Sequence, residues 1–232
     1  MSLLEKLLGK PGKGTLAPEA YADSNPRRSA VVRQVASLLL QYPEEDLIAS
    51  LPVLRSALEE SGALEPGVQE LFGWLAARPL PGVQSVYVQE FDLSKRHSLH
   101  LTYWTDGDTR RRGEALAAFK EVYREHGMLP EGTELPDYLP LVLEFAAKVS
   151  PEDGYELLQR YRPSLELLRL ALRDAGLPYH HVLALVCTTL PGVSPEDAQT
   201  VMRTAGYGPP TETVGLEPYS SRLLPLSERN RT

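Results

Sequence analysis

Three consecutive arginines, Arg110 to Arg112, follow a turn that contains two aspartates, Asp106 and Asp108. Guanidinium groups at the start of a helix can bind an anion, because their N–H donors add to the positive end of the helix dipole. One interpretation of Arg110, Arg111 and Arg112 is therefore an anion or nucleotide site. The other is a capped turn whose arginines pair with nearby acids, and runs of charge are usually solvated faces of that kind.

Other residue types that could do chemistry are sparse. His97 and His100 stand three residues apart, but a lone pair of histidines is weak support for a metal site, and we predict none. Cys187 is the single cysteine, so no disulfide or multi-cysteine metal site can form within one chain. It lies in an apolar run without an activating charge, which argues against a cysteine nucleophile. We therefore expect no catalytic residue, no bound cofactor and no enzymatic activity.

A second informative segment, ELPDYLPLVLEF, covers residues 134–145. Its two prolines restrict the backbone on either side of Asp137 and Tyr138, and Asp137 is suited to cap the apolar helix that follows. The minimal interpretation is a helix N-terminus. The functional interpretation is a rigid link that presents Glu134, Asp137 and Tyr138 at the edge of a groove, where acids could receive a basic helical peptide.

Composition narrows the class of protein. The chain has 232 residues, of which 42% are hydrophobic and 24% charged, enough to fill a core. The net charge of −7 argues against a general nucleic-acid partner. Arg27 and Arg28 precede apolar residues as in an export signal, but Arg33 and Gln34 interrupt that run. With no apolar run of about 18 to 20 residues, we expect a cytoplasmic protein without direct membrane insertion.

Helical periodicity dominates the chain, and apolar residues recur on one helical face in segment after segment. Pro52 is expected to split one of these helices. Alternation typical of a strand occurs only at residues 99–104, LHLTYW. We predict an all-α fold, a single multi-helix domain of about eight to ten helices over residues 26–206. Residues 1–25 are predicted to form a flexible N-terminal segment, and residues 207–232 an extended or disordered tail.

Residues 91–116, FDLSKRHSLHLTYWTDGDTRRRGEAL, together with residues 134–145, resemble the signature regions of a known family. This family comprises the nitrate reductase molybdenum cofactor assembly chaperones, also called the delta subunit of respiratory nitrate reductase. The chaperones of trimethylamine-oxide and dimethyl-sulfoxide reductases belong to the wider group. The resemblance extends over roughly residues 31–205 and rests on the pairing of the two segments.

The resemblance implies a cytoplasmic all-α chaperone. Its partner would be the apo catalytic (alpha) subunit of a membrane-bound nitrate reductase, notably that subunit's N-terminal peptide. The chaperone would hold this subunit until the molybdenum cofactor is inserted, restrain membrane attachment meanwhile, and then leave. No oligomeric state follows from the sequence.

The resemblance also implies where the partner binds. Residues 134–140, called here the hinge motif, match the acidic–proline motif of the family, except that Tyr138 stands where histidine is usual. The residues expected to bind the partner are Glu134, Leu135, Pro136, Asp137, Tyr138, Leu139, Phe91, Asp92 and Tyr103. The alternative function is an anion- or nucleotide-binding protein that uses Arg110, Arg111 and Arg112, with the guanine dinucleotide of the cofactor as one such anion.

Overall fold

The protein has an all-α fold in the computed structural model, which describes residues 23–106, 110–128 and 134–205. Within these ranges there are eleven α-helices, one π-helical turn, one 3-10 turn and no β-strand. The predicted fold class is therefore confirmed, with more helices than the eight to ten expected. The predicted turn at Asp108 and the predicted tail, and nearly all of the predicted N-terminal segment, lie outside the described residues and stay predictions.

The helices are named here with their bounds. The first six are α2 (Pro26–Leu39), α3 (Glu45–Glu60), α4 (Pro66–Ala76), α5 (Leu80–Tyr87), α6 (Leu101–Asp106) and α7 (Arg110–Glu125). The others are α8 (Leu139–Lys148), α9 (Pro151–Arg160), α10 (Arg162–Asp174), α11 (His180–Cys187) and α12 (Ala198–Thr204). The π-helical turn η1 (Val88–Asp92) continues α5, and the 3-10 turn η2 (Lys95–His97) follows it.

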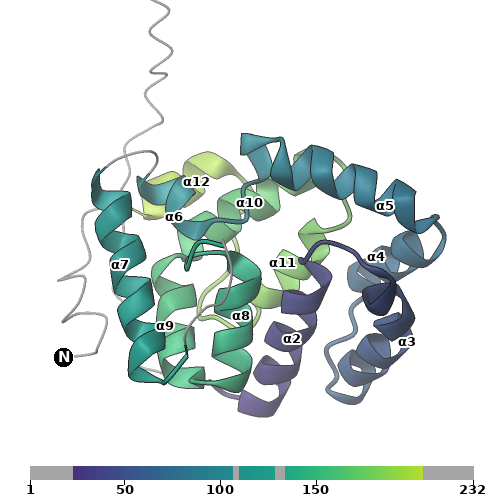
Figure 1. The fold of residues 1–232 in the computed structure, drawn as a ribbon, viewed down its shortest axis with the longest axis horizontal. Coiled ribbons are helices and arrows are strands. Elements are labelled where there is room, and N and C mark those ends of the chain that lie inside the picture. Colours follow the sequence, from purple (N-terminus) through teal and green to yellow (C-terminus); the bar gives the residue numbers. More distant parts are fainter. Residues whose placement is uncertain (1–22, 107–109, 129–133, 206–232) are drawn as a thin grey trace, which may run out of the picture.

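The helices pack around one continuous apolar core. Its centre is made by α2, α8, α9, α10 and α11, and the most extensive helix contacts are those of α2 with α8, α8 with α9 and α10 with α11. Figure 1 shows α3 and α4 on one side of this centre, α7 on the opposite side, and α5 crossing one end. None of the described helices is long and apolar enough to cross a membrane.

Helix α2 illustrates how sequence and packing agree. Asn25 caps it by accepting a hydrogen bond from the Arg28 N–H at 3.1 Å, and Pro26 opens it where a missing donor costs little. Ser37 donates from its hydroxyl to the carbonyl of Pro140 at 2.7 Å, which ties α2 to the start of α8. The apolar residues that α2 buries are Val32, Val35, Ala36 and Leu39.

The predicted break at Pro52 is wrong, because tertiary contacts override local preference. Pro52 lies inside α3 and does not split it. It is exposed, whereas Leu54 and Leu58 of the same helix are buried, so packing offsets the roughly 3 kcal/mol that an internal proline costs. The strand candidate, residues 99–104, is largely helix α6 and keeps one isolated antiparallel bridge, between His100 and Tyr138.

Gly154 lets α9 approach α8 at backbone distance. A Cβ added at Gly154 would lie 2.3 Å from both the Cα and the Cβ of Ala146. Carbon atoms that are not bonded normally stay about 3.5 to 4.0 Å apart. The contact therefore fixes the position of α8, the helix that follows the hinge motif.

Gly154→Ala should lower the free energy of unfolding by about 2 to 3 kcal/mol, because the added methyl meets backbone that cannot rotate away. Gly73→Ala is the matched control, since Gly73 is also helical and nothing lies within 4 Å of an added Cβ. It should stabilise the protein by about 0.5 to 1 kcal/mol through helix propensity. Urea unfolding followed by circular dichroism measures both changes. A Gly154→Ala protein as stable as the control would contradict the close contact.

Candidate functional site

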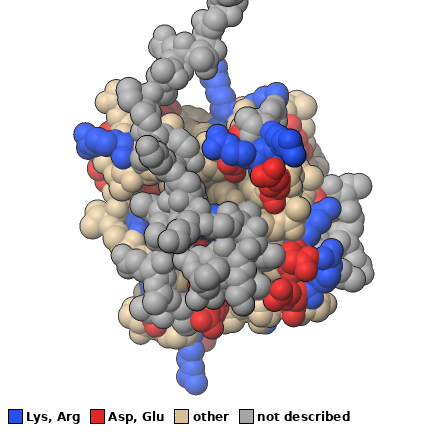
Figure 2. Space-filling view, turned by 90° about the vertical axis from the view of Figure 1, so that its left-hand side faces the viewer, with Lys and Arg blue, Asp and Glu red and all other residues tan. Residues whose placement is uncertain are grey.

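The three arginines do not converge on one point. Arg110 is almost fully exposed, and its Nε lies 3.6 Å from a carboxylate oxygen of Glu114 one turn later. Arg112 is half-buried and donates from Nε to the Thr102 hydroxyl at 3.2 Å. Arg111 is exposed. Figure 2 faces the side that carries α7 and shows basic and acidic side chains next to one another there. This arrangement favours the solvated-face interpretation over a phosphate cradle.

The histidines and the cysteine belong to separate local environments. His97 lies 3.0 Å from a carboxylate oxygen of Glu90, and His100 lies 3.2 Å from one of Asp137, so the two histidines face different partners. No group of three or more metal-binding side chains occurs in the part of the chain that the structure describes. Cys187 is buried, and burial raises the pKa of its thiol, which disfavours the reactive thiolate.

The two segments singled out in the sequence meet at Asp137, whose side chain is completely buried. One carboxylate oxygen accepts from the Thr102 N–H at 3.0 Å and from the Thr102 hydroxyl at 2.6 Å. The other lies 3.2 Å from His100 Nδ1. Because the Thr102 N–H belongs to the first turn of α6, Asp137 caps α6. The prediction that it caps α8 is wrong, since Tyr138 holds that cap position without a side-chain bond.

The electrostatics of Asp137 follow from these contacts. Burial on its own would raise the pKa of the carboxyl, but the hydrogen bonds from His100 and Thr102 outweigh it and hold the pKa below its ordinary value of 3.8. The group is therefore an ionised carboxylate at neutral pH. An ionised carboxylate inside a core is stable only with donors at its oxygens, so the segment that carries the donors cannot move away independently.

Backbone bonds complete the attachment of the hinge motif. The Leu101 N–H donates to the Asp137 carbonyl at 3.1 Å, and the Leu139 N–H donates to the Leu99 carbonyl at 2.8 Å. The hydroxyl of Tyr123, on α7, donates to the Pro136 carbonyl at 2.7 Å. The hinge motif is thus held by α6 and α7, as well as by α2 through Ser37, and Tyr138 has a fixed position.

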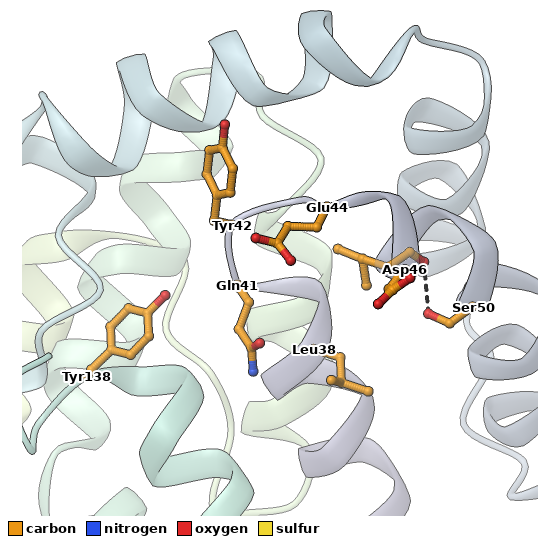
Figure 3. Close-up of a pocket in the computed structure, with 8 residues that line it drawn as sticks. Leu38, Gln41, Tyr42, Glu44, Asp46, Ser50 and Tyr138 are labelled. Atoms are coloured by element: carbon orange, nitrogen blue, oxygen red, sulfur yellow. Dashed lines mark hydrogen bonds between the residues drawn. The ribbon is translucent and has the colours of Figure 1, made fainter. Parts of the chain in front are cut away.

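Tyr138 opens onto a groove of about 580 Å³ between the end of α2, the start of α3 and the start of α8. Figure 3 shows Tyr138, directly before α8, on one side of the groove, and Glu44, directly before α3, with Asp46, in the first turn of α3, on the other. The lining combines apolar and aromatic surface with acidic groups, and none of the described lining residues is basic. The lining residues are Leu38, Gln41, Tyr42, Glu44, Asp46, Leu47, Ser50 and Tyr138.

Tyr138, which lines one side of the groove, is hydrogen-bonded to the buried Tyr87 behind it. The two hydroxyl oxygens are 3.2 Å apart, and the Tyr87 hydroxyl donates to the Leu40 carbonyl at 2.9 Å. Burial raises the pKa of both phenols, so both are neutral at physiological pH. The ring of Tyr42 stands edge-on to that of Tyr87, with centroids 5.6 Å apart.

The acidic rim of the groove, Glu44 and Asp46, is exposed to solvent. The loop that carries it is tied to α5, because the Gln84 amide donates to the Pro43 carbonyl at 2.9 Å. The rim is thus a pair of exposed acidic side chains on a tethered backbone. Acids that reach solvent next to an apolar groove attract a cationic partner and add selectivity to apolar burial.

The residues predicted to bind the partner therefore separate into two groups. Those that are exposed or half-buried are Glu134, Leu135, Tyr138, Asp92 and Tyr103. Those that are buried are Pro136, Asp137, Leu139 and Phe91. Only Tyr138 lines the groove itself. Phe91 supports the tyrosine pair, since its ring centroid lies 4.8 Å from that of Tyr87.

The other half of the groove, which includes Tyr42, Glu44 and Asp46, is not predicted as a site from the sequence. The one local signal is that three consecutive acids, residues 44–46, follow directly after a tyrosine and a proline. An acidic run at a helix start is common and favours the helix dipole, so the pattern by itself does not indicate a site. Whether the acidic run belongs to a site depends on Tyr138, which is far away in sequence.

The fold is that of a known class of helical proteins. A crystal structure from Archaeoglobus fulgidus, provisionally described as a redox enzyme maturation protein, matches 75% of this chain and 96% of its own. The TM-score is 0.51 and the sequence identity is 20%. The family model for the nitrate reductase delta subunit matches residues 58–184. This chain belongs to that family.

Several curated proteins are similar in sequence. NarX of Mycobacterium tuberculosis H37Rv, a nitrate reductase-like protein, is 45% identical over 161 residues, which cover 68% of this chain and 24% of NarX. The chain thus spans about a quarter of that relative. The probable nitrate reductase molybdenum cofactor assembly chaperone NarJ of Bacillus subtilis is 31% identical over 68% of this chain and 86% of its own. The nitrate reductase molybdenum cofactor assembly chaperone NarJ of Escherichia coli K12 is 31% identical over 62% of this chain and 63% of its own.

Asp137→Asn should lower the free energy of unfolding by about 2 to 4 kcal/mol at pH 7. The amide has a single acceptor oxygen where the carboxylate has two, so it leaves buried donors unmet. The folded-state pKa of Asp137 is depressed, so its stabilisation is complete above the ordinary value of 3.8 and disappears as the pH falls through the lower folded value. The difference between wild type and variant should therefore be constant from pH 7 to 5 and shrink below about pH 4.

Urea unfolding at a series of pH values measures this difference. Glu134→Gln is the control, since Glu134 is exposed in the same motif and should change stability by less than about 0.5 kcal/mol. Equal stability of Asp137→Asn and wild type at pH 7 would rule out the capping role of Asp137.

Proposed function

We propose that this chain is a system-specific chaperone for the apo catalytic subunit of respiratory nitrate reductase. It binds that subunit, including its N-terminal segment, in the cytoplasm and assists insertion of the molybdenum cofactor before the complex attaches to the membrane. Membership of the delta subunit family supports this proposal, as do the relatives described as molybdenum cofactor assembly chaperones. In this role the chain binds a polypeptide and catalyses no reaction.

The groove at Tyr138 is the observation that carries the proposal at the level of residues. It offers apolar surface from Leu38 and Leu47, aromatic rings, and two exposed acids without a basic neighbour in the described lining. An amphipathic helix with an apolar face and basic flanks fits such a groove, with apolar burial supplying most of the affinity. The acids add long-range attraction and selectivity.

The remaining residues of the hinge motif then have distinct roles. Glu134 and Leu135 are exposed beside Tyr138, and Glu134 is close enough to contribute to the raised pKa of Tyr138, which places it within reach of a bound peptide. Asp137 is buried and positions Tyr138 without touching the partner.

The anion-binding alternative has less support, because Arg110 and Arg112 diverge and Arg112 already bonds Thr102. Equilibrium dialysis against guanosine monophosphate separates the two functions. A peptide chaperone without a nucleotide site retains none.

Charge reversal at Glu44 or Glu134 should weaken binding of a peptide that copies the N-terminus of the catalytic subunit, by roughly tenfold at low salt and much less at 0.5 M salt. Glu59→Lys is the matched control, because Glu59 is exposed on α3 and does not line the groove. It changes the net charge equally. Tyr42→Ala should weaken binding at every salt concentration, since it removes apolar contact.

Isothermal titration calorimetry with the purified protein measures these affinities, and a scrambled peptide tests specificity. Micromolar or tighter binding of the native peptide alone is expected. Equal binding of the scrambled peptide would overturn the proposal. Equal losses of peptide affinity in Glu44→Lys and Glu59→Lys would show that the groove is not the binding site.

A further inference from the structure

The tyrosine pair has a fixed hydrogen-bond direction. The Tyr87 hydroxyl carries one hydrogen, and that hydrogen goes to the Leu40 carbonyl, which can only accept. The 3.2 Å contact between the two hydroxyls must therefore be donated by Tyr138. The Tyr138 oxygen then has no hydrogen left for a ligand. Towards the groove it can act only as an acceptor.

Other polar groups of the lining also act only as hydrogen-bond acceptors towards a ligand. The Ser50 hydroxyl donates to the Leu47 carbonyl at 2.8 Å, so it too can only accept from a ligand. Carboxylates are acceptors without donors, which adds Glu44 and Asp46. The lining groups that can still donate are the Gln41 amide and the Tyr42 hydroxyl. Most of the polar groups that meet a ligand here therefore require it to bring hydrogens.

This polarity does not depend on pH in the physiological range. Burial raises the pKa of Tyr87 and of Tyr138, so both phenols keep their hydrogens and the direction of the chain from Tyr138 to Leu40 is preserved. Glu44 and Asp46 are the acidic groups of the lining. A ligand group must thus be rich in donors and positively charged to satisfy this wall.

We propose that the groove contains a subsite for one cationic side chain of the bound polypeptide, formed by Tyr138 and Glu44, with arginine preferred over lysine. The inference rests on the proposed function, because it specifies the ligand chemistry of the same groove. A guanidinium has five donors in a plane and no acceptor, so it can bond a carboxylate and the phenol oxygen together. The exposed ring of Tyr42, in the same lining, offers a face on which the cation can stack.

The test is a double-mutant cycle on the full chain, with a peptide that copies the first twenty residues of the catalytic subunit. Each arginine of the peptide is replaced in turn by citrulline, which keeps the shape and removes the charge, and each lysine by acetyllysine. One position should lose affinity by about tenfold or more, the range expected for a charge-assisted bond. The other positions should change less than about threefold.

The protein variants locate that loss. In Glu44→Gln and in Tyr138→Phe the penalty for the critical replacement should shrink to less than about threefold, whereas it should keep its full size in the control Glu59→Gln. Glu44 makes no side-chain cap bond at α3, and Tyr87 keeps its bond to Leu40 when the Tyr138 hydroxyl is removed. Both variants should therefore fold, which circular dichroism checks.

Three outcomes would overturn the subsite. A native peptide that binds but tolerates every replacement shows that no single cation is required. A penalty of the same size in all protein variants places the cation elsewhere. A large loss on acetylation of the peptide N-terminus, with none at any side chain, assigns the site to the terminal amine. Failure of the unmodified peptide to bind is a different result, since it rejects the proposed function and the subsite with it.

Discussion

The buried carboxylate of Asp137 is the constraint on which the rest of the site depends. A charge inside a protein is stable only if donors meet its lone pairs, and Thr102 and His100 supply them here. Those donors belong to the segment that starts α6, more than thirty residues earlier in the chain. The hinge motif is therefore fixed against α6, and Tyr138, the next residue, is fixed at the wall of the groove.

The groove joins a rigid wall to an adaptable rim. The wall is the neutral phenol of Tyr138, which the buried Tyr87 holds in a hydrogen-bonded chain that ends at the Leu40 carbonyl. The rim consists of exposed carboxylates on a loop held by α5. A wall of this kind provides shape and directional acceptors, while the rim acts over a longer range and is weakened by salt. The family model matches residues 58–184, which include Tyr87 and Tyr138 but not Glu44 and Asp46.

The sequence was a good guide to the elements and a partial guide to the site. The helical stripes predict most of the helices, because apolar periodicity is a local signal. Of the hinge motif selected from the sequence, Tyr138 lines the groove. The capping role of Asp137 at α6 was not predicted, because its partner Thr102 is distant in sequence. Nothing local distinguishes a cap of α8 from a cap of α6.

The sequence by itself determined the all-α class and the family resemblance, since helical periodicity and paired motifs are properties of neighbouring residues. Only the tertiary structure decided three things: that residues 99–104 are mostly helix, that Arg110 and Arg112 bond different partners, and that Glu44 and Asp46 line the same groove as Tyr138. Each depends on which distant groups are buried together. Burial and hydrogen-bond satisfaction act on the folded chain as a whole, so local sequence cannot specify them.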